Sequence, residues 1–185
     1  MNTPLYIFLG VVGLVIIWVI WTYNRFVTLR YRAKEGFSDI EVQLKRRYDL
    51  IPNLVETVRG YMVHEREVFE KVTAARAQTV AVTSNTERAE SENLLSQTLK
   101  TLFAVSENYP DLKANANFLD LQRELADTEN KIQASRRFYN TMVRDYNIKI
   151  EVFPARVIAS FFNFLKLEFF ETEAELEREP VKVKF

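Results

Sequence analysis

LYIFLGVVGLVIIWVIWTY, residues Leu5–Tyr23, decides the fold class of this chain, because its nineteen residues include no charged side chain. As an α-helix the stretch would be about 28 Å long, close to the thickness of the hydrocarbon core of a bilayer. Twelve of the nineteen residues are Leu, Ile, Val or Phe, and each favours membrane insertion by about 0.3–0.6 kcal/mol near the helix centre. Their sum is on the order of −4 to −7 kcal/mol, so the stretch predicts a transmembrane helix.

Aromatic residues, which favour the membrane–water interface, are concentrated at the C-terminal end of this stretch. A buried core helix is one alternative, but a core helix rarely extends over nineteen residues without a polar stripe. A cleaved signal peptide is another, which the bulky residues at the end of the stretch and the lack of Lys or Arg in residues 1–4 disfavour. We expect the helix to be anchored by Leu5, Leu9, Val12, Ile16, Ile20, Trp18, Trp21 and Tyr23.

Basic residues follow the predicted transmembrane helix, whereas residues 1–4 contain none. Because Lys and Arg close to a span stay on the cytoplasmic side, the N-terminus is predicted to lie outside and the main domain in the cytoplasm. The residues that set this topology are Arg25, Arg30, Arg32 and Lys34.

Apolar residues continue at helical spacing after the span, which predicts an all-α domain over residues 24–166. The predicted fold is an N-terminal transmembrane helix followed by an antiparallel bundle of three or four helices. Residues 1–4 are a short external N-terminus in this scheme, and residues 167–185 are an acidic tail that we expect to be mobile. The clearest seam, which is typical of a bundle or a coiled coil, consists of Phe118, Leu121, Leu125, Thr128, Ile132, Ser135, Tyr139, Met142 and Tyr146.

Local signals predict where individual helices begin and end. Pro52 lacks a backbone donor, so it either kinks a helix or lies in the first turn of a new one. A helix should stop just before Pro110, because the residue before proline avoids the α region. The segment Pro110–Ala116 is predicted to be a loop, and Asn117 to be the N-cap of the next helix.

A phenylalanine-rich segment follows Pro154, and residues 155–166 are expected to form a short amphipathic helix. The rings have two interpretations: they cap the core of the bundle, which we favour, or they lie in the membrane interface beside the span. The residues concerned are Phe153, Phe161, Phe162 and Phe164.

The composition argues against several classes of chemistry. The 185 residues include no cysteine, and 25 basic and 25 acidic residues give a net charge of zero, unlike the basic footprint of a nucleic-acid-binding protein. Four dispersed glycines form no phosphate-binding loop. The single histidine, His64, precedes Glu65, but the second ligand of an HExxH zinc motif is missing. We therefore expect no catalytic residue, no metal and no cofactor.

Carboxylates near the apolar seams are the remaining candidates for catalysis, since burial can raise the pKa of a carboxyl group. They are Glu56, Glu65 and Glu129. Inside a bundle such a group more often pairs with arginine, and the available partners are Arg136, Arg137 and Arg144. The basic run Lys45-Arg46-Arg47 is predicted to be a solvated face, because three consecutive helical residues fan over about 200°.

Two motifs resemble the LemA family: RRYDLIPNLVETV at Arg46–Val58, and LQRELADTENKI with RRFYNTMVRDYN within Leu121–Asn147. The likeness extends over Ser38–Arg76 and Tyr109–Phe164 and, with the N-terminal span, over nearly the whole chain. It implies a single-pass protein of the bacterial inner (cytoplasmic) membrane with a cytoplasmic helical bundle, and no established enzymatic activity. One branch of the family is associated with forming magnetosome membranes, which suggests a membrane-organising role by analogy.

The resulting hypothesis is a non-catalytic, membrane-anchored helical scaffold that self-associates or recruits partners. The expected partners are membrane lipids, further copies of the chain and an unidentified membrane or cytoplasmic protein, with no nucleic acid. Anchoring concentrates copies in two dimensions, so weak lateral contacts can be sufficient for assembly. The alternatives are a membrane-remodelling protein that uses the phenylalanine-rich segment, and a carboxylate-based hydrolase with Glu65 as its acid.

Overall fold

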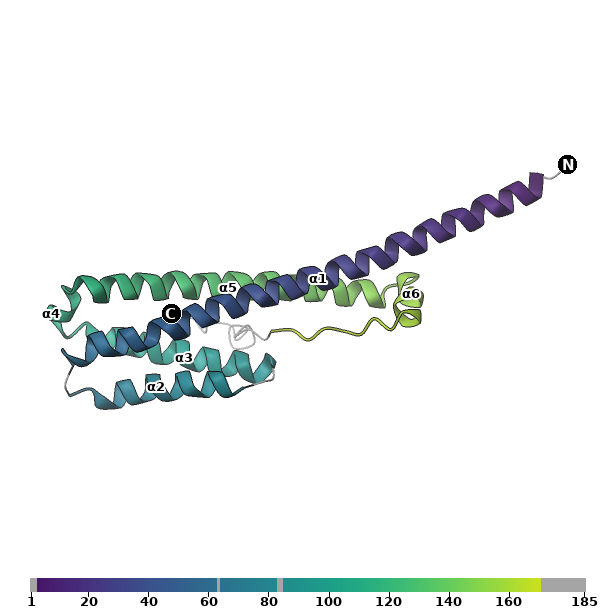
Figure 1. Ribbon diagram of the computed structural model, residues 1–185. Helices are drawn as coiled ribbons and strands as arrows, with labels where there is room; N and C mark the ends of the chain where they lie inside the picture. The colour runs from purple at the N-terminus through teal and green to yellow at the C-terminus, as the bar shows by residue number, and fades with distance from the viewer. Residues whose placement is uncertain (1–2, 63, 83–84, 171–185) are drawn as a thin grey trace, which may run out of the picture. The chain divides into compact units, whose positions relative to one another are not determined.

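The chain is all-α in the computed structural model, which describes residues 3–62, 64–82 and 85–170. Within these residues there are six helices and no strand (Figure 1). The helices are α1 (Thr3–Arg59), α2 (Arg66–Ala81), α3 (Asn85–Ser106), α4 (Pro110–Lys113), α5 (Ala116–Glu151) and α6 (Ala155–Phe161). The prediction of an all-α chain with a long apolar N-terminal helix is confirmed.

Two compact units make up the chain. The anchor unit contains Met1–Phe37 and Phe138–Phe169, and the bundle unit contains Ser38–Arg137 and Phe170–Phe185. The long helices α1 and α5 each contribute to both units.

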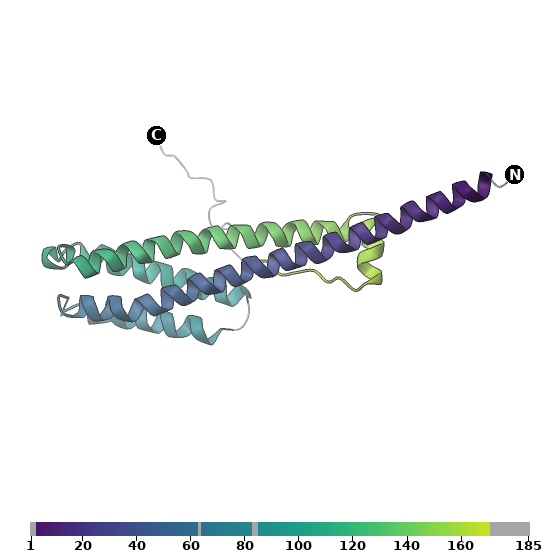
Figure 2. The same ribbon diagram turned by 45° about the horizontal axis from the view of Figure 1, so that its top comes forward.

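The bundle unit is a four-helix arrangement of the second half of α1 with α2, α3 and the first half of α5. Short connections join successive helices, which alternate in direction, and α2 lies beside α3 in both views (Figures 1 and 2). The predicted antiparallel bundle is therefore confirmed. Its buried core contains Ile51, Leu54, Val58, Met62, Phe69, Val72, Ala75, Leu95, Leu99, Leu102, Leu112, Phe118 and Leu125.

The ends of the helices near Pro110 differ from the prediction in two places. The helix before the proline does end early, at Ser106, but the predicted loop Pro110–Ala116 contains the short helix α4. Pro110 fits the first turn of α4 because an N–H there would have no helical acceptor. The N-cap of α5 is Asn115 rather than Asn117, since the Oδ1 atom of Asn115 accepts a 3.0 Å hydrogen bond from the N–H of Phe118.

This assignment of the cap makes a direct prediction. Replacement Asn115→Ala should lower the free energy of unfolding by about 0.5–2 kcal/mol, because an N–H in the first turn of α5 loses its acceptor. Asn117→Ala, which removes the cap expected from the sequence, should change it by less than about 0.5 kcal/mol. Chemical unfolding of the intact chain in a mild detergent measures both values, and equal losses would contradict the assignment.

The anchor unit contains the apolar first part of α1, the end of α5, and α6 with the residues that follow it. Its core is formed by Phe26, Leu29, Tyr146, Ile150, Ala155, Ile158 and Ala159. The helices α1 and α5 approach closely at Gly36, where an added Cβ atom would lie 2.9 Å from the Phe138 ring and 3.3 Å from the Tyr139 Cα atom. Gly36 therefore permits this contact.

The predicted acidic tail is described only at its beginning. Leu167 and Glu168 are tied to α5 by hydrogen bonds, whereas residues 171–185 lie outside the described residues. The mobility of the tail stays a prediction.

Candidate functional site

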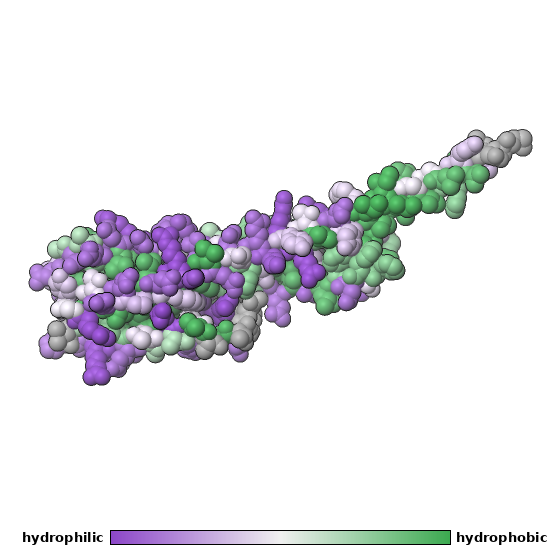
Figure 3. Space-filling view, in the orientation of Figure 1, coloured by the Kyte–Doolittle hydropathy of each residue, from purple (hydrophilic) through white to green (hydrophobic). Residues whose placement is uncertain are grey.

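The first part of α1 exposes its apolar side chains. Only 6% of its most apolar 18-residue window is buried, and among the described residues it is the one helix apolar and long enough to cross a membrane. In Figure 3 this part of the helix is a nearly continuous apolar surface. A core helix of a soluble domain would be mostly buried, so its exposure favours lipid as the surroundings. The expected anchor residues are exposed except Trp18, which is half-buried: Leu5, Leu9, Val12, Ile16, Ile20, Trp18, Trp21 and Tyr23.

The basic residues expected to set the topology follow this apolar surface on α1. All four side chains are exposed, so their charges are available to water or to lipid headgroups. These residues are Arg25, Arg30, Arg32 and Lys34.

A tight turn after α6 gives neighbouring phenylalanines different surroundings. Asn163 has a positive φ of 56°, its N–H bonds to the Ser160 carbonyl, and the Phe164 N–H bonds to the Ala159 carbonyl. This is the Schellman pattern, in which the chain reverses and the residue after the turn packs back on the helix. Phe164 accordingly packs against the anchor core, with its ring centroid 5.0 Å from that of Phe26.

The other rings point away from the protein. Phe153 is 85% and Phe161 is 81% exposed, whereas Phe162 is partly covered by Tyr23, with ring centroids 4.8 Å apart. Our favoured interpretation, that the rings cap the core of the bundle, is therefore wrong for Phe153 and Phe161, and Phe164 packs against the anchor core rather than the core of the bundle. The α6 patch is the exposed apolar surface formed by Val152, Phe153, Val157, Phe161, Phe162 and Leu165.

The residues that follow α6 run back along α5 and are fixed by its side chains. Tyr146 donates a hydrogen bond to the Leu165 carbonyl at 3.0 Å, and the side-chain amide of Asn147 makes two hydrogen bonds with the backbone of Leu167, each 2.9 Å long. Burial raises the pKa of the Tyr146 hydroxyl above its usual value. The tyrosine therefore stays a neutral donor over the physiological pH range. These hydrogen bonds and the ion pair of Lys166 with Glu151 hold the residues that follow α6 against α5.

A buried ion-pair cluster lies inside the bundle unit, centred on Arg47 of α1. Arg47 is 1% exposed, and its Nη2 atom lies 3.0 Å from Oε2 of Glu92, which is 0% exposed. Its Nη1 atom donates to Glu129 at 2.7 Å and to the Ser96 hydroxyl at 3.0 Å. A cavity of about 210 Å³ adjoins Glu129, so one side of the cluster is open and the Glu92 side is closed.

Glu92 has the most perturbed environment of the cluster. Desolvation by burial raises the pKa of its carboxyl group to about 7, against the opposing attraction of Arg47 and Arg136. Neither carboxylate oxygen accepts a hydrogen bond of good geometry from the described residues, although Arg47 is at contact distance. Desolvation is therefore the main reason for the raised pKa, and the nearby negative charge of Glu129 adds to it.

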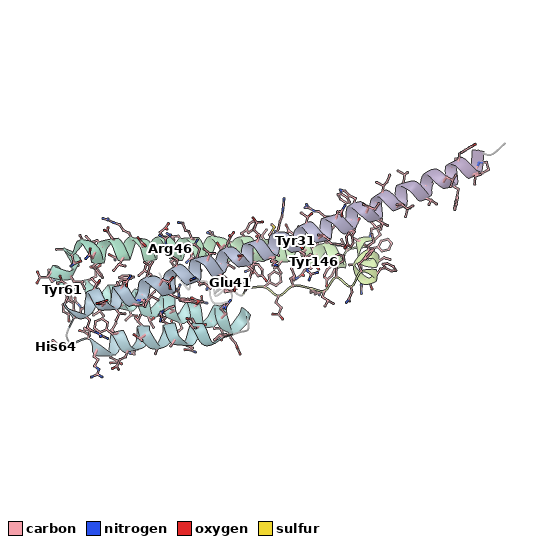
Figure 4. The ribbon with its side chains drawn as sticks, in the orientation of Figure 1. Tyr31, Glu41, Arg46, Tyr61, His64 and Tyr146 are labelled. Atoms are coloured by element: carbon pink, nitrogen blue, oxygen red, sulfur yellow. The ribbon has the colours of Figure 1, made fainter. Side chains whose placement is uncertain are left out.

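The solvated-face prediction for Lys45-Arg46-Arg47 is therefore wrong at Arg47. The signal that identifies it is the apolar stripe of α1, because the buried positions Ile40, Leu44, Ile51 and Leu54 leave a gap at residue 47 that a helix must also bury. By contrast, the neighbouring Arg46, which is labelled in Figure 4, is partly exposed and forms surface ion pairs with Glu124 and Asp127.

Glu92, which we did not single out from the sequence, has the same explanation. It continues the buried stripe of α3 that contains Ala89, Leu95 and Leu99. A charged residue at a stripe position was thus the available signal for both members of the pair.

The carboxylates that we considered for catalysis do not come together. Glu56 is exposed, Glu129 pairs with Arg47, and Glu65 accepts a 3.3 Å hydrogen bond from the Tyr109 hydroxyl. His64 lies exposed in the connection between α1 and α2 (Figure 4). Among the described residues, no three His, Asp or Glu side chains are grouped so that they could hold a metal ion.

The partners expected for a buried carboxylate have separate roles. Arg136 is buried, donates to Asn93 at 3.0 Å and places its guanidinium 4.9 Å from the centre of the Phe170 ring. Arg144 is exposed and pairs with the adjacent Asp145, and Arg137 is also exposed.

Removal of the buried cation should destabilise the bundle strongly. Arg47→Met should lower the free energy of unfolding at pH 8 by on the order of 3–5 kcal/mol, because Glu92 and Glu129 lose the cation that they share and Glu92 must stay buried without it or take up a proton. The adjacent control Arg46→Met removes only surface ion pairs and should cost less than about 1 kcal/mol. Adding Glu92→Met to Arg47→Met should recover much of the loss. Chemical unfolding of the intact chain in detergent measures all three variants, and equal effects at positions 46 and 47 would refute the cluster.

The raised pKa of Glu92 also predicts a pH dependence of stability. Because the folded-state pKa of about 7 exceeds the ordinary value, the folded state binds more protons, and stability falls as pH rises from 4.5 towards 7. Between pH 5 and pH 8 the free energy of unfolding of the wild-type chain should fall by roughly 2 kcal/mol more than that of the Glu92→Gln variant, whose residue 92 cannot titrate. Exposed carboxylates contribute equally to the pH dependence of both proteins, so their contributions cancel in the difference. Parallel pH profiles for the two proteins would show that Glu92 does not titrate in this range.

Together, the helical bundle and the exposed apolar helix define the class of membrane-associated helical proteins. The family model of the LemA family matches residues 36–185, and the chain belongs to this family.

Curated relatives agree with this assignment. Protein LemA of Metamycoplasma hominis is 26% identical over 159 residues, which cover 85% of this chain and 72% of that protein. Magnetosome protein MamQ of Magnetospirillum gryphiswaldense is 24% identical over 174 residues, and magnetosome protein MamQ 2 of Paramagnetospirillum magneticum is 25% identical over 175 residues. Each match covers 80% of this chain and 64% of the MamQ protein, so the chain spans less than two-thirds of their length. None of these names denotes an enzyme, and with α1 they fit a membrane-associated helical protein.

Proposed function

We propose that this chain is a non-catalytic scaffold, anchored in the membrane by α1, that self-associates or recruits protein partners through its bundle unit. The observation that carries the proposal is the composition of α1 itself. One helix exposes an apolar surface long enough to span a bilayer and then contributes Ile51, Leu54 and Val58 to the bundle core. Because exposed apolar surface of that size is unfavourable in water, lipid is the surroundings that it fits.

The proposed topology has the N-terminus outside and the bundle unit in the cytoplasm. It is supported by the exposed basic residues that follow the apolar part of α1, among them Arg25 and Arg30. Cations adjacent to a span favour the cytoplasmic face.

Lateral association is supported by the physics of anchoring. The bundle unit exposes single apolar side chains such as Val42 and Leu94, which would give only weak contacts between free molecules. Anchoring confines copies to two dimensions and raises their effective concentration, so weak contacts can hold an assembly together.

A non-catalytic role is supported by the arrangement of the titratable groups. The most perturbed carboxylate, Glu92, is 0% exposed and pairs with Arg47, so its burial serves the core of the bundle. Glu65, the best candidate acid, is only hydrogen-bonded to a tyrosine.

The scaffold proposal can be tested with single cysteines, because the chain has none of its own. Val42→Cys, Leu94→Cys and Glu70→Cys place thiols on exposed positions of three bundle helices. In intact cells, a permeant bismaleimide should yield a discrete larger product that contains either a second copy or one reproducible partner, and an impermeant maleimide should not react. Only uncrosslinked monomer at all three positions would overturn the scaffold role, and reaction with the impermeant reagent would reverse the topology.

Membrane organisation is the second candidate function, and the α6 patch is the observation that favours it. Exposed Phe153 and Phe161 are large apolar side chains beside the predicted span, and surfaces of this kind contact lipid in interfacial segments. The relatives named as magnetosome proteins MamQ and MamQ 2 support this role by analogy. In this case the anchored chain would act on the bilayer as well as on proteins.

A further inference from the structure

The α6 patch is an unusual surface for a protein in water. Three of its members, Phe153, Val157 and Phe161, recur at intervals of four residues and are each more than 60% exposed. Contiguous exposed surface of this kind marks an interaction site. The opposite side of α6 is not available to a partner, because Ala155, Ile158 and Ala159 belong to the anchor core.

The contacts of α6 place the patch beside the aromatic end of the apolar stretch. Trp18 and Val19 of α1 pack against the same core as α6. Tyr23 contacts both Phe162 and Phe164, with ring centroids 4.8 and 5.6 Å apart. In Figure 3 the apolar surface of α1 continues onto the side chains over α6. The patch is therefore continuous with the surface that lipid covers in the proposed function.

The chemistry around the patch fits the headgroup region rather than the hydrocarbon core. The backbone is irregular directly after α6, and irregular backbone exposed to hydrocarbon would leave polar groups unsatisfied. Arg156 is exposed within the same segment, as is Lys166, which also pairs with Glu151, and the Lys149 ammonium lies 5.6 Å from the centre of the Trp21 ring. Cations and aromatic rings at one level are typical of the interface between headgroups and acyl chains.

We propose that the α6 patch inserts into the headgroup–acyl boundary beside the end of the α1 span and forms a second membrane contact within the anchor unit. This inference rests on the proposed function, because α1 must cross the bilayer for the boundary to lie at that level. The consequence concerns orientation. A single spanning helix can rotate freely about its own axis, whereas a second membrane contact through the α6 patch fixes the rotation of the anchor unit about the α1 span.

Depth-dependent quenching tests the proposal on the intact chain. Phe161→Cys and, independently, Phe153→Cys carry an environment-sensitive fluorophore, and neither residue contributes to the core. Ile16→Cys serves as the control inside the span, and Glu124→Cys as the control on the bundle. The protein is reconstituted into vesicles of phosphatidylcholine with a minor fraction of phosphatidylglycerol, at decreasing protein-to-lipid ratios, with spin-labelled lipids that quench at shallow or deep positions.

The expected result is that shallow quenchers remove most of the emission at positions 161 and 153 at every protein-to-lipid ratio, while position 124 is unaffected. Emission at 161 and 153 that is as unquenched as at 124, together with quenching at 16, would overturn the α6 contact and leave the anchor intact. No quenching at 16 would overturn the proposed function itself and the inference with it. Labels at 161 and 153 that are shielded only at high protein density would show that a second copy covers the patch, which also overturns the lipid contact.

Discussion

The constraint on which the structure depends is that α1 must change its surroundings along its own length. A helix satisfies its backbone hydrogen bonds internally, so it can lie in lipid or in water without breaking. What changes along α1 is the pattern of its side chains. Up to Tyr23 apolar residues occupy nearly every side, whereas from Phe26 to Val58 the buried residues form one stripe at intervals of three and four. The stripe fixes which face of α1 the other helices cover.

The buried stripes of α1 and α3 contain an ion pair, Arg47 with Glu92, whose energetics differ from those of the leucines around it. Arg47 and Glu92 are 1% and 0% exposed, so both are removed from water and their attraction must offset a large desolvation penalty. Leucines can pack in more than one register, but this pair is satisfied only when α1 and α3 meet at one level. We infer that the pair contributes more to the choice of register than to the net stability of the bundle.

Much of the architecture could be predicted from periodicity. The span, the continuation of its helix and the buried seam of α5 all follow from apolar spacing, and every seam position is buried or half-buried. The buried ion pair was missed because Lys45-Arg46-Arg47 was interpreted as one solvated face, although Arg47 occupies a stripe position. The cap of α5 was misplaced by two residues because Asn115 and Asn117 are chemically identical candidates. Sequence spacing alone does not show which asparagine has the extended backbone that a cap requires.

The phenylalanines around α6 show the limit of periodicity most clearly. Phe161 and Phe164 are three residues apart, which on a continuing helix would place them on one face. Instead, the positive φ of Asn163 reverses the chain between them, so Phe164 enters the core while Phe161 remains exposed. In water an exposed phenylalanine ring is unfavourable, because burial of the ring would stabilise the fold by about 1.5–3 kcal/mol. The turn therefore directs Phe164 to the anchor core and leaves Phe161 exposed beside the aromatic end of α1, which is the arrangement that the proposed lipid contact of the α6 patch requires.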